Sequence, residues 1–165
     1  MRYQAMALAA AIACAGAAQA QEAPGAALDA LYEVISGPVG QARDWDRFRA
    51  LFLDGARMSV ITTGADGAEH VVVLTLEEYI DRNGERLAEI GFTETETRRL
   101  THVYGGMATV LSAYAAVRAD TGELMAEGVN SLTILNDDGQ WKIASIAWRA
   151  ADADWPVERA FEAQP

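Results

Sequence analysis

The second half of the chain reads as four consecutive β-strands, and this run constrains the fold more than any other feature. Residues 92–104, 107–118 and 125–149 are long segments rich in β-branched and aromatic residues. Glycine-containing turns break them at Gly105-Gly106, at Asp120-Thr121-Gly122, and at Asp137-Asp138-Gly139, which folds the last segment back on itself. Because short turns join antiparallel neighbours, the run predicts an antiparallel sheet.

Two helical segments open the chain. In the first, Leu28, Leu31, Tyr32 and Ile35 recur at helical spacing before Gly37-Pro38 ends the helix. Asp44 is a candidate N-cap for the second. Its apolar face is formed by Trp45, Phe48, Leu51 and Phe52, and it is expected to end at Asp54-Gly55.

Two short strands, 57–62 and 69–74, then precede a third helix. Thr75 and Glu78 have the spacing of a capping box at its start, and Gly91 follows its last apolar residue. The order of elements predicts an α+β fold with the helices gathered on one face of the sheet.

The long strands lack the alternation expected of a sheet with one face in water. Residues 107–117 carry apolar side chains at successive positions, and on a regular strand Trp141 and Ile143 point away from Ile146 and Trp148. Because helices can cover only one face, we expect a homodimer in which a second subunit packs on the outer face.

The first twenty residues have the pattern of a secretory signal peptide. Arg2 precedes an apolar run too short to span a membrane, and Ala18-Gln19-Ala20 is a small-x-small cleavage site. We therefore expect cleavage after Ala20, a periplasmic or secreted protein, and no membrane insertion after cleavage. Cys14, the single cysteine, lies within this segment, and its lipidation is the alternative.

The remaining chain is expected to form one domain. We divide it into a flexible lead at 21–26, a domain at 27–150 and a C-terminal tail at 151–165. Apolar residues make up 51% of the chain, enough for a sizeable core. The net charge of −11 argues against nucleic acid and anionic membranes as partners.

The chain resembles the nuclear transport factor 2-like (SnoaL-like) superfamily over roughly residues 27 to 150. More narrowly, it resembles a bacterial exported group of that superfamily without an assigned function. The resemblance is carried by the order and spacing of several short motifs: Ser36-Gly37-Pro38-Val39-Gly40, Arg43 to Phe52, Glu78-Tyr79, Gly91-Phe92, Tyr104 to Val110, Gly128-Val129-Asn130-Ser131-Leu132 and Asp138 to Trp148.

The resemblance implies a cone: a strongly curved antiparallel sheet wrapped around three helices, with a pocket inside. It also implies dimers through the outer sheet face. Isomerases of the superfamily use a carboxylate in the first strand and a tyrosine from the first helix. Tyr32 stands where that tyrosine would be, but residues 57–62 hold no Asp or Glu, so the resemblance does not extend to that chemistry. The fold alone does not decide the function.

Glu94 and His102 are the candidate acid–base pair, with Tyr114 as a third candidate catalytic residue. On a regular strand Glu94, Glu96, Arg98 and His102 point to the same side, which would let Glu94 and His102 work together in the pocket. The alternative is a solvated ladder of charged residues. A β-bulge would also change which of them share a face.

The candidate ligand-binding residues are polar or aromatic groups set against apolar walls. Ser112, Tyr114 and Asn130 share strand faces with apolar neighbours, which is the composition of a small-molecule pocket. A purely structural set of hydrogen bonds is the alternative. Four aromatic residues complete the candidates: Tyr32, Trp45, Tyr79 and Trp141.

Two scattered histidines, with no cysteine beyond the signal segment, give no zinc-binding set, so no metal or cofactor is expected. The leading hypothesis is an exported protein that binds a small, largely apolar molecule in the cone. If the protein is an enzyme, we expect cofactor-free acid–base chemistry of the lyase, isomerase or hydrolase kind. The alternative is a non-catalytic dimeric scaffold. An open pocket with inward polar groups favours a ligand, and a filled pocket favours a scaffold.

Overall fold

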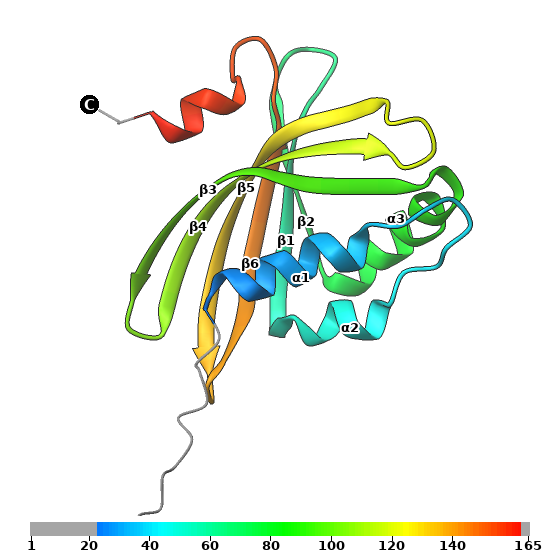
Figure 1. Ribbon diagram of the computed structural model, residues 1–165. Coiled ribbons are helices and arrows are strands. Elements are labelled where there is room, and N and C mark those ends of the chain that lie inside the picture. The colour runs from blue at the N-terminus through cyan, green and yellow to red at the C-terminus, as the bar shows by residue number, and fades with distance from the viewer. Residues whose placement is uncertain (1–22, 163–165) are drawn as a thin grey trace, which may run out of the picture.

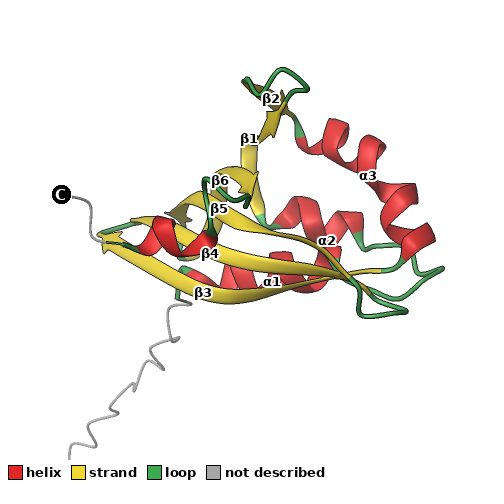
Figure 2. Cartoon of the chain, turned by 90° about the horizontal axis from the view of Figure 1, so that it is seen from above, coloured by secondary structure: helices red, strands yellow, loops and turns green. Residues whose placement is uncertain are grey.

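One strongly curved sheet encloses three helices on its concave side (Figures 1 and 2). This computed structural model describes residues 23–162. The six strands lie in the order β2-β1-β6-β5-β4-β3. In chain order the elements are α1 (Gly25–Ile35), α2 (Trp45–Ala50), β1 (Phe52–Thr63), β2 (Glu69–Leu74), α3 (Leu76–Ile90), β3 (Phe92–Tyr104), β4 (Met107–Arg118), β5 (Leu124–Asp137), β6 (Gln140–Ala150) and the 3-10 helix η1 (Val157–Phe161).

The predicted α+β cone with three helices is confirmed. Neighbouring strands pair antiparallel, except that β1 and β6 pair parallel.

The predicted signal peptide at 1–20, with Cys14, lies outside the described residues. α1 begins at Gly25, inside the segment expected to be a flexible lead. None of the helices among residues 23–162 is long and apolar enough to cross a membrane.

Local capping signals place the helices where the sequence indicates. The Asp44 carboxylate accepts from the backbone N–H of Arg47, and Thr75 and Glu78 form both bonds of a capping box. The expected end of α2 is wrong, because the helix stops at Ala50 and Phe52 already belongs to β1. Phe52 pairs with β6 while its ring, 3% exposed, packs 5.0 Å from that of Phe48.

Extra residues in four strands bend the sheet. The pairing register shifts at Thr97 in β3, at Met125 in β5, at Ala144 in β6 and between Phe52 and Arg57 in β1, where one strand has residues without a partner on the next. Such bulges increase local twist and bend the strand. They also reverse the alternation of side chains, so residues on either side of a bulge cannot be assigned to faces by parity.

The prediction that Trp141 and Trp148 point to opposite faces is therefore wrong. Ala144 lies between Ile143 and Ile146 as an extra residue, so both isoleucines reach the concave side, where they are almost fully buried. Trp141 and Trp148 both pack against the same core. The apparent two-faced character of β6 is a consequence of its bulge, and it does not by itself require a partner.

The C-terminal segment covers part of the outer face of the sheet. η1 lies across the sheet from the three helices (Figure 1) and contacts β5. The Arg98 guanidinium lies 4.5 Å from the centre of the Phe161 ring, as in a cation–π contact. Ala113, paired with Arg98, is fully buried on this side. The tail predicted at 151–165 thus includes a packed 3-10 turn.

A buried arginine joins the ends of α1 and α3. Arg43 is 6% exposed, and its guanidinium donates to four carbonyl oxygens: those of Ile35 at 2.8 Å, Leu87 at 2.9 Å, Gly37 at 3.0 Å and Gln41 at 2.5 Å. Ile35 ends α1 and Leu87 lies in the last turn of α3, where carbonyl groups lack helical partners. One side chain therefore satisfies acceptors from both helices and from the loop between α1 and α2.

Replacement of Arg43 by methionine is expected to lower the free energy of unfolding by about 3 kcal/mol, because buried carbonyl groups lose their charged donor. Urea unfolding followed by circular dichroism measures this. Arg47→Gln is the matched control: its ion pair with Glu33 is exposed, and the loss should stay below about 1 kcal/mol. Equal losses for the two variants would contradict the role assigned to Arg43.

Candidate functional site

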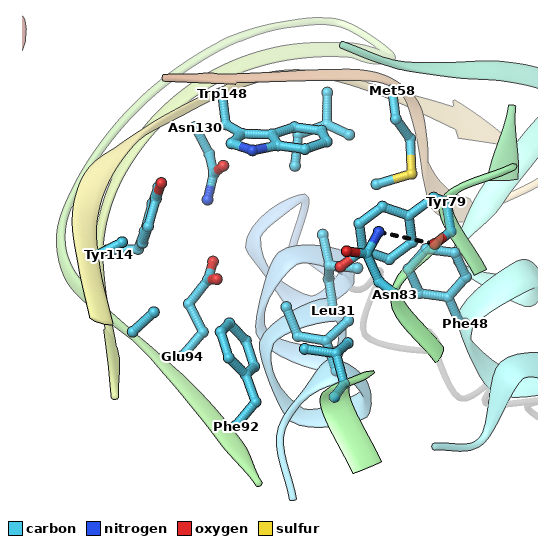
Figure 3. A pocket seen from close by; sticks show the side chains of 15 residues that line it. Leu31, Phe48, Met58, Tyr79, Asn83, Phe92, Glu94, Tyr114, Asn130 and Trp148 are labelled. Atoms are coloured by element: carbon cyan, nitrogen blue, oxygen red, sulfur yellow. Dashed lines mark hydrogen bonds between the residues drawn. The ribbon is translucent and has the colours of Figure 1, made fainter. Parts of the chain in front are cut away.

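A cavity of about 240 Å³ lies between the concave face of the sheet and the helices (Figure 3). Most of its wall is apolar, and residues come from all three helices and five strands. The lining consists of Leu31, Ile35, Phe48, Met58, Tyr79, Asn83, Leu87, Phe92, Glu94, Tyr114, Ala116, Ala126, Asn130, Ile146 and Trp148. Its volume is slightly below the usual range for sites that bind drug-sized ligands, which suits a molecule of one or two rings.

Three polar side chains gather at one corner of the cavity. Glu94, Tyr114 and Asn130 come from the adjacent strands β3, β4 and β5, and all three reach the cavity from the concave face (Figure 3). Here the bend of the sheet brings neighbouring strands around a common point. A bound molecule would meet this polar corner at one end and mostly apolar side chains elsewhere, with Tyr79 and Asn83 of α3 as the other polar lining residues.

Burial raises the pKa of Glu94 to about 7, from an ordinary value of 4.5. The loss of hydration disfavours the ionised carboxylate, and the Asn130 amide, which faces it, offsets part of this effect. Near neutral pH the carboxyl group is thus present in both protonation states. That is the property required of a group that both gives and takes protons.

Tyr114 is a hydrogen-bond donor held over a glycine. Burial, with the nearby Glu94 carboxylate, raises the pKa of its hydroxyl, which stays protonated at neutral pH. Tyr114 pairs with Gly128 across β4 and β5, and a Cβ atom at position 128 would lie 2.5 Å from the Tyr114 hydroxyl oxygen. Only glycine leaves this space, so the β5 sequence decides where the tyrosine lies.

A row of side chains leads away from the cavity at Asn130. Its Nδ2 donates to the Tyr32 hydroxyl at 3.0 Å, and that hydroxyl lies 2.7 Å from Ser112 Oγ. Ser112 Oγ in turn donates to Glu96 Oε1 at 2.5 Å, and Arg99 binds the Glu96 carboxylate. Ser112 is fully buried, so these bonds satisfy polar groups in the core.

The predicted shared face of Glu94 and His102 is wrong. Thr97 is the extra residue of β3, so side chains beyond it alternate in the opposite sense. Glu94 pairs with Ala116 on the concave side, whereas His102 pairs with Thr109 and is exposed on the outer face. His102 cannot exchange protons with Glu94 in this arrangement.

The other candidates divide between the cavity wall and its support. Tyr79 lines the cavity, whereas Tyr32 and Ser112 lie behind Asn130 in the hydrogen-bonded row. Trp45 does not line it; its ring packs edge-on against Phe48 and lies over Gly84 of α3. Trp141 packs against the core away from the cavity lining.

Sequence reasoning missed several lining residues, chiefly Trp148, Asn83, Phe92 and Met58. Asn83 follows Tyr79 by one helical turn, and this spacing could have indicated it. Trp148 was hidden by the bulge at Ala144, which leaves no mark in the sequence. Among residues 23–162 there is no group of three His, Cys, Asp or Glu side chains that could hold a metal ion.

Solved structures of similar shape identify the fold. A protein of unknown function with a cystatin-like fold from Nostoc punctiforme superposes with a TM-score of 0.60, at 10% identity over 78% of this chain and 88% of that one. A dehydratase candidate of the NTF2-like family from Streptomyces avermitilis gives 0.58, at 19% identity over 78% and 94%. The chain has the NTF2-like fold.

The NTF2-like fold also occurs in the beta subunit of a candidate aromatic-ring-hydroxylating dioxygenase from Novosphingobium aromaticivorans. That chain matches with a TM-score of 0.58, at 18% identity over 81% of this chain and 90% of its own. No family model matches the sequence, and no curated protein does either. At these identities the likeness establishes the fold alone.

Within this NTF2-like fold, β1 is longer than expected and includes Asp54. That carboxylate is exposed and does not line the cavity, and Met58 represents β1 there instead. The carboxyl group available to a ligand is Glu94 on β3, on the opposite side of the cavity from Met58 (Figure 3).

Glu94 is expected to make the protein less stable as the pH rises from about 4.5 to 7. In this window the folded protein holds a proton that the unfolded chain has lost, so the free energy of unfolding falls, by about 3 kcal/mol in total. Urea unfolding at a series of pH values measures the slope. Glu94→Gln should remove this fall in the free energy of unfolding, and the variant should be more stable than the wild type at pH 8.

Glu85→Gln is the control for that experiment, since it makes the same chemical change at an exposed position of α3. Its unfolding free energy should follow the wild-type pH dependence. A Glu94→Gln protein that kept the wild-type slope would show that Glu94 does not titrate in this range.

Proposed function

We propose that the protein binds a small, uncharged, largely apolar molecule in the cavity, and that Glu94 exchanges a proton with that molecule. The observation that carries this proposal is the polar corner formed by Glu94, Tyr114 and Asn130 in a mostly apolar wall. The other polar lining residues, Tyr79 and Asn83, come from α3. The cavity is open rather than filled by its own aromatic side chains, which supports a ligand over a scaffold.

The charges around the cavity favour an uncharged ligand. Among the described residues, the lining includes no lysine or arginine. Arg43 lies nearby, but its guanidinium already donates to four carbonyl groups. An anionic ligand would meet Glu94 without a compensating cation, inside a protein of net charge −11. Burial of an unpaired charge is costly, so carboxylates and phosphates are expected to bind poorly.

The chemistry that this corner supports is proton transfer without a cofactor. Ionised Glu94 can take a proton from the carbon next to a carbonyl group, and the electron pair of that C–H bond moves to the carbonyl oxygen. The Tyr114 hydroxyl can donate a hydrogen bond to the oxygen as its charge develops. Return of the proton to another atom gives an isomerase, and loss of a neighbouring hydroxyl group as water gives a lyase.

The similar structures are compatible with both of the functions considered. The dehydratase candidate from Streptomyces avermitilis supports acid–base chemistry in such a cavity. The dioxygenase beta subunit has the fold as one part of a larger enzyme, which supports the alternative of a non-catalytic scaffold. We favour the ligand because a scaffold has no need of a carboxyl group buried beside an open cavity.

Export and dimerisation belong to the same proposal. Export to the periplasm or beyond rests on the signal-like pattern of residues 1–20.

A homodimer through the outer sheet face rests on a row of small and apolar side chains that crosses all six strands: Val73, Ser59, Ala147, Ser131, Leu111 and Leu100. Val73 and Leu100 are 57% and 41% exposed. A row of small and apolar side chains on a sheet face suits packing against a second sheet.

Acetophenone and benzoate form a matched pair of probes, because they are nearly equal in shape and differ in charge. At pH 8 acetophenone is expected to bind at least about tenfold more tightly, as measured by calorimetry. Its affinity should fall above pH 7, where Glu94 loses the proton through which it donates a hydrogen bond to the ketone oxygen. Glu94→Gln should make the affinity independent of pH.

Tyr114→Phe should weaken acetophenone binding about fivefold to tenfold, the value of one hydrogen bond. Tyr104→Phe is the control, since Tyr104 is 83% exposed and outside the cavity. Equal binding of benzoate and acetophenone would contradict the assignment of an uncharged ligand. Native mass spectrometry of protein from its natural host would identify any ligand that it retains.

The dimer is tested by Ser131→Arg, which places a long cation at the centre of the outer row without disturbing the core. Light scattering coupled to size exclusion should show a dimer for the wild type and a monomer for the variant. Gln140→Arg adds the same charge at the exposed β5–β6 turn and should leave the dimer intact. A monomeric wild type would refute this part of the proposal.

A further inference from the structure

The hydrogen-bonded row behind the cavity has one possible direction. Glu96 is held by Arg99 as a carboxylate, and a carboxylate only accepts hydrogen bonds. Ser112 must therefore give its single hydroxyl proton to Glu96. The Ser112 oxygen is then the acceptor for the Tyr32 hydroxyl proton.

This direction determines how Asn130 is oriented. Since Tyr32 has already given its only proton to Ser112, its oxygen can only accept from Asn130. The Asn130 amide must then present its NH₂ group, and not its carbonyl oxygen, to Tyr32. That NH₂ group has a second N–H, and Figure 3 shows the Asn130 nitrogen on the side facing Glu94.

We propose that Tyr32 and Ser112 are positioning residues, which hold the Asn130 amide so that an N–H group faces the Glu94 carboxyl. The inference rests on the proposed function, because Glu94 is the group assigned to proton transfer there. The orientation of the Asn130 amide itself does not require a ligand. Glu96 and Arg99 at the charged end of the row thus orient a hydrogen-bond donor, the Asn130 amide, through the two buried hydroxyl groups of Ser112 and Tyr32.

The arrangement controls the protonation of Glu94. An N–H directed at the carboxyl group favours its ionised form, against the burial that favours the protonated form. A flipped amide would present its carbonyl oxygen and would favour the protonated form instead. Among the described residues, the other titratable groups that face Glu94 are Tyr32 on α1, Tyr79 on α3 and Tyr114 on β4. Burial raises the pKa of each of these hydroxyls, so they remain neutral while Glu94 titrates.

The test is an NMR titration of the Glu94 carboxyl carbon in ligand-free protein. Tyr32→Phe removes one hydroxyl and Ser112→Ala the other, and both variants should move the Glu94 midpoint upward by about one pH unit. Asn130→Leu removes the donor and should move it in the same direction. Tyr104→Phe is the control, since it removes a hydroxyl at an exposed position outside the cavity, and it should leave the midpoint unchanged.

Two results would overturn the proposal. An unchanged midpoint in Asn130→Leu would show that the amide does not act on Glu94. A raised midpoint in Asn130→Leu, with wild-type values in Tyr32→Phe and Ser112→Ala, would show that the amide is oriented without the row. A purely structural role of the two hydroxyls would lower the free energy of unfolding and leave the midpoint unmoved.

A second measurement keeps the test decisive if Tyr32→Phe does not fold. The side-chain amide protons of Asn130 should exchange slowly with solvent in the wild type and at least about tenfold faster in Ser112→Ala. Because both measurements use empty protein, failure to find any ligand would count against the proposed function without affecting this inference. Conversely, acetophenone binding with an unchanged Glu94 midpoint in Tyr32→Phe and Ser112→Ala would count against this inference and leave the proposed function in place.

Discussion

The bend of the sheet is the constraint on which the rest of the structure depends. Extra residues at Thr97, Met125 and Ala144 let the strands curl around the helices, and each one resets the alternation of side chains. Glu94 faces the cavity and His102 faces outward because Thr97 lies between them. Trp148 lines the cavity because Ala144 precedes it. A flat sheet of the same sequence would have neither this cavity nor its polar corner.

The cavity remains open because two sets of hydrogen bonds, those of Arg43 and those of the row behind Asn130, fix the positions of its walls. Arg43 fixes the ends of α1 and α3 through backbone carbonyl groups, so these helices cannot collapse onto the sheet without leaving buried acceptors unpaired. The row from Asn130 to Glu96 fixes α1 against β4 and β5 in the same way. Polar groups set the spacing here, while apolar packing supplies most of the stability.

The candidate site combines a titratable group, Glu94, with a row of hydrogen bonds that runs from Asn130 to the ion pair of Glu96 and Arg99. Glu94 titrates near neutral pH because it is buried without a cation, and Asn130 limits how far burial can raise its pKa. Tyr32 and Ser112 were predicted to bind the ligand. They lie instead behind Asn130, outside the cavity lining, and are hydrogen-bonded in the row. Under the proposed function, residues that do not touch the ligand would influence the proton affinity of Glu94, which would touch it.

The sequence by itself determined the local elements. The capping box at Thr75 and Glu78, the N-cap at Asp44 and the glycine-containing turns each depend on residues a few positions apart, and all were found where predicted. The polar residues Glu94, Tyr114 and Asn130 could also be named in advance, because polar side chains among apolar neighbours are visible in the sequence.

Only the tertiary structure decided which of these residues meet. A β-bulge depends on the register of a partner strand distant in sequence, so parity within a single strand gave a wrong face for His102 and for one of the two tryptophans. The parallel pairing of β1 with β6, the four carbonyl groups around Arg43 and the row behind Asn130 likewise join segments far apart in the chain. Local sequence encodes propensity and periodicity, whereas these contacts arise from how the whole sheet bends.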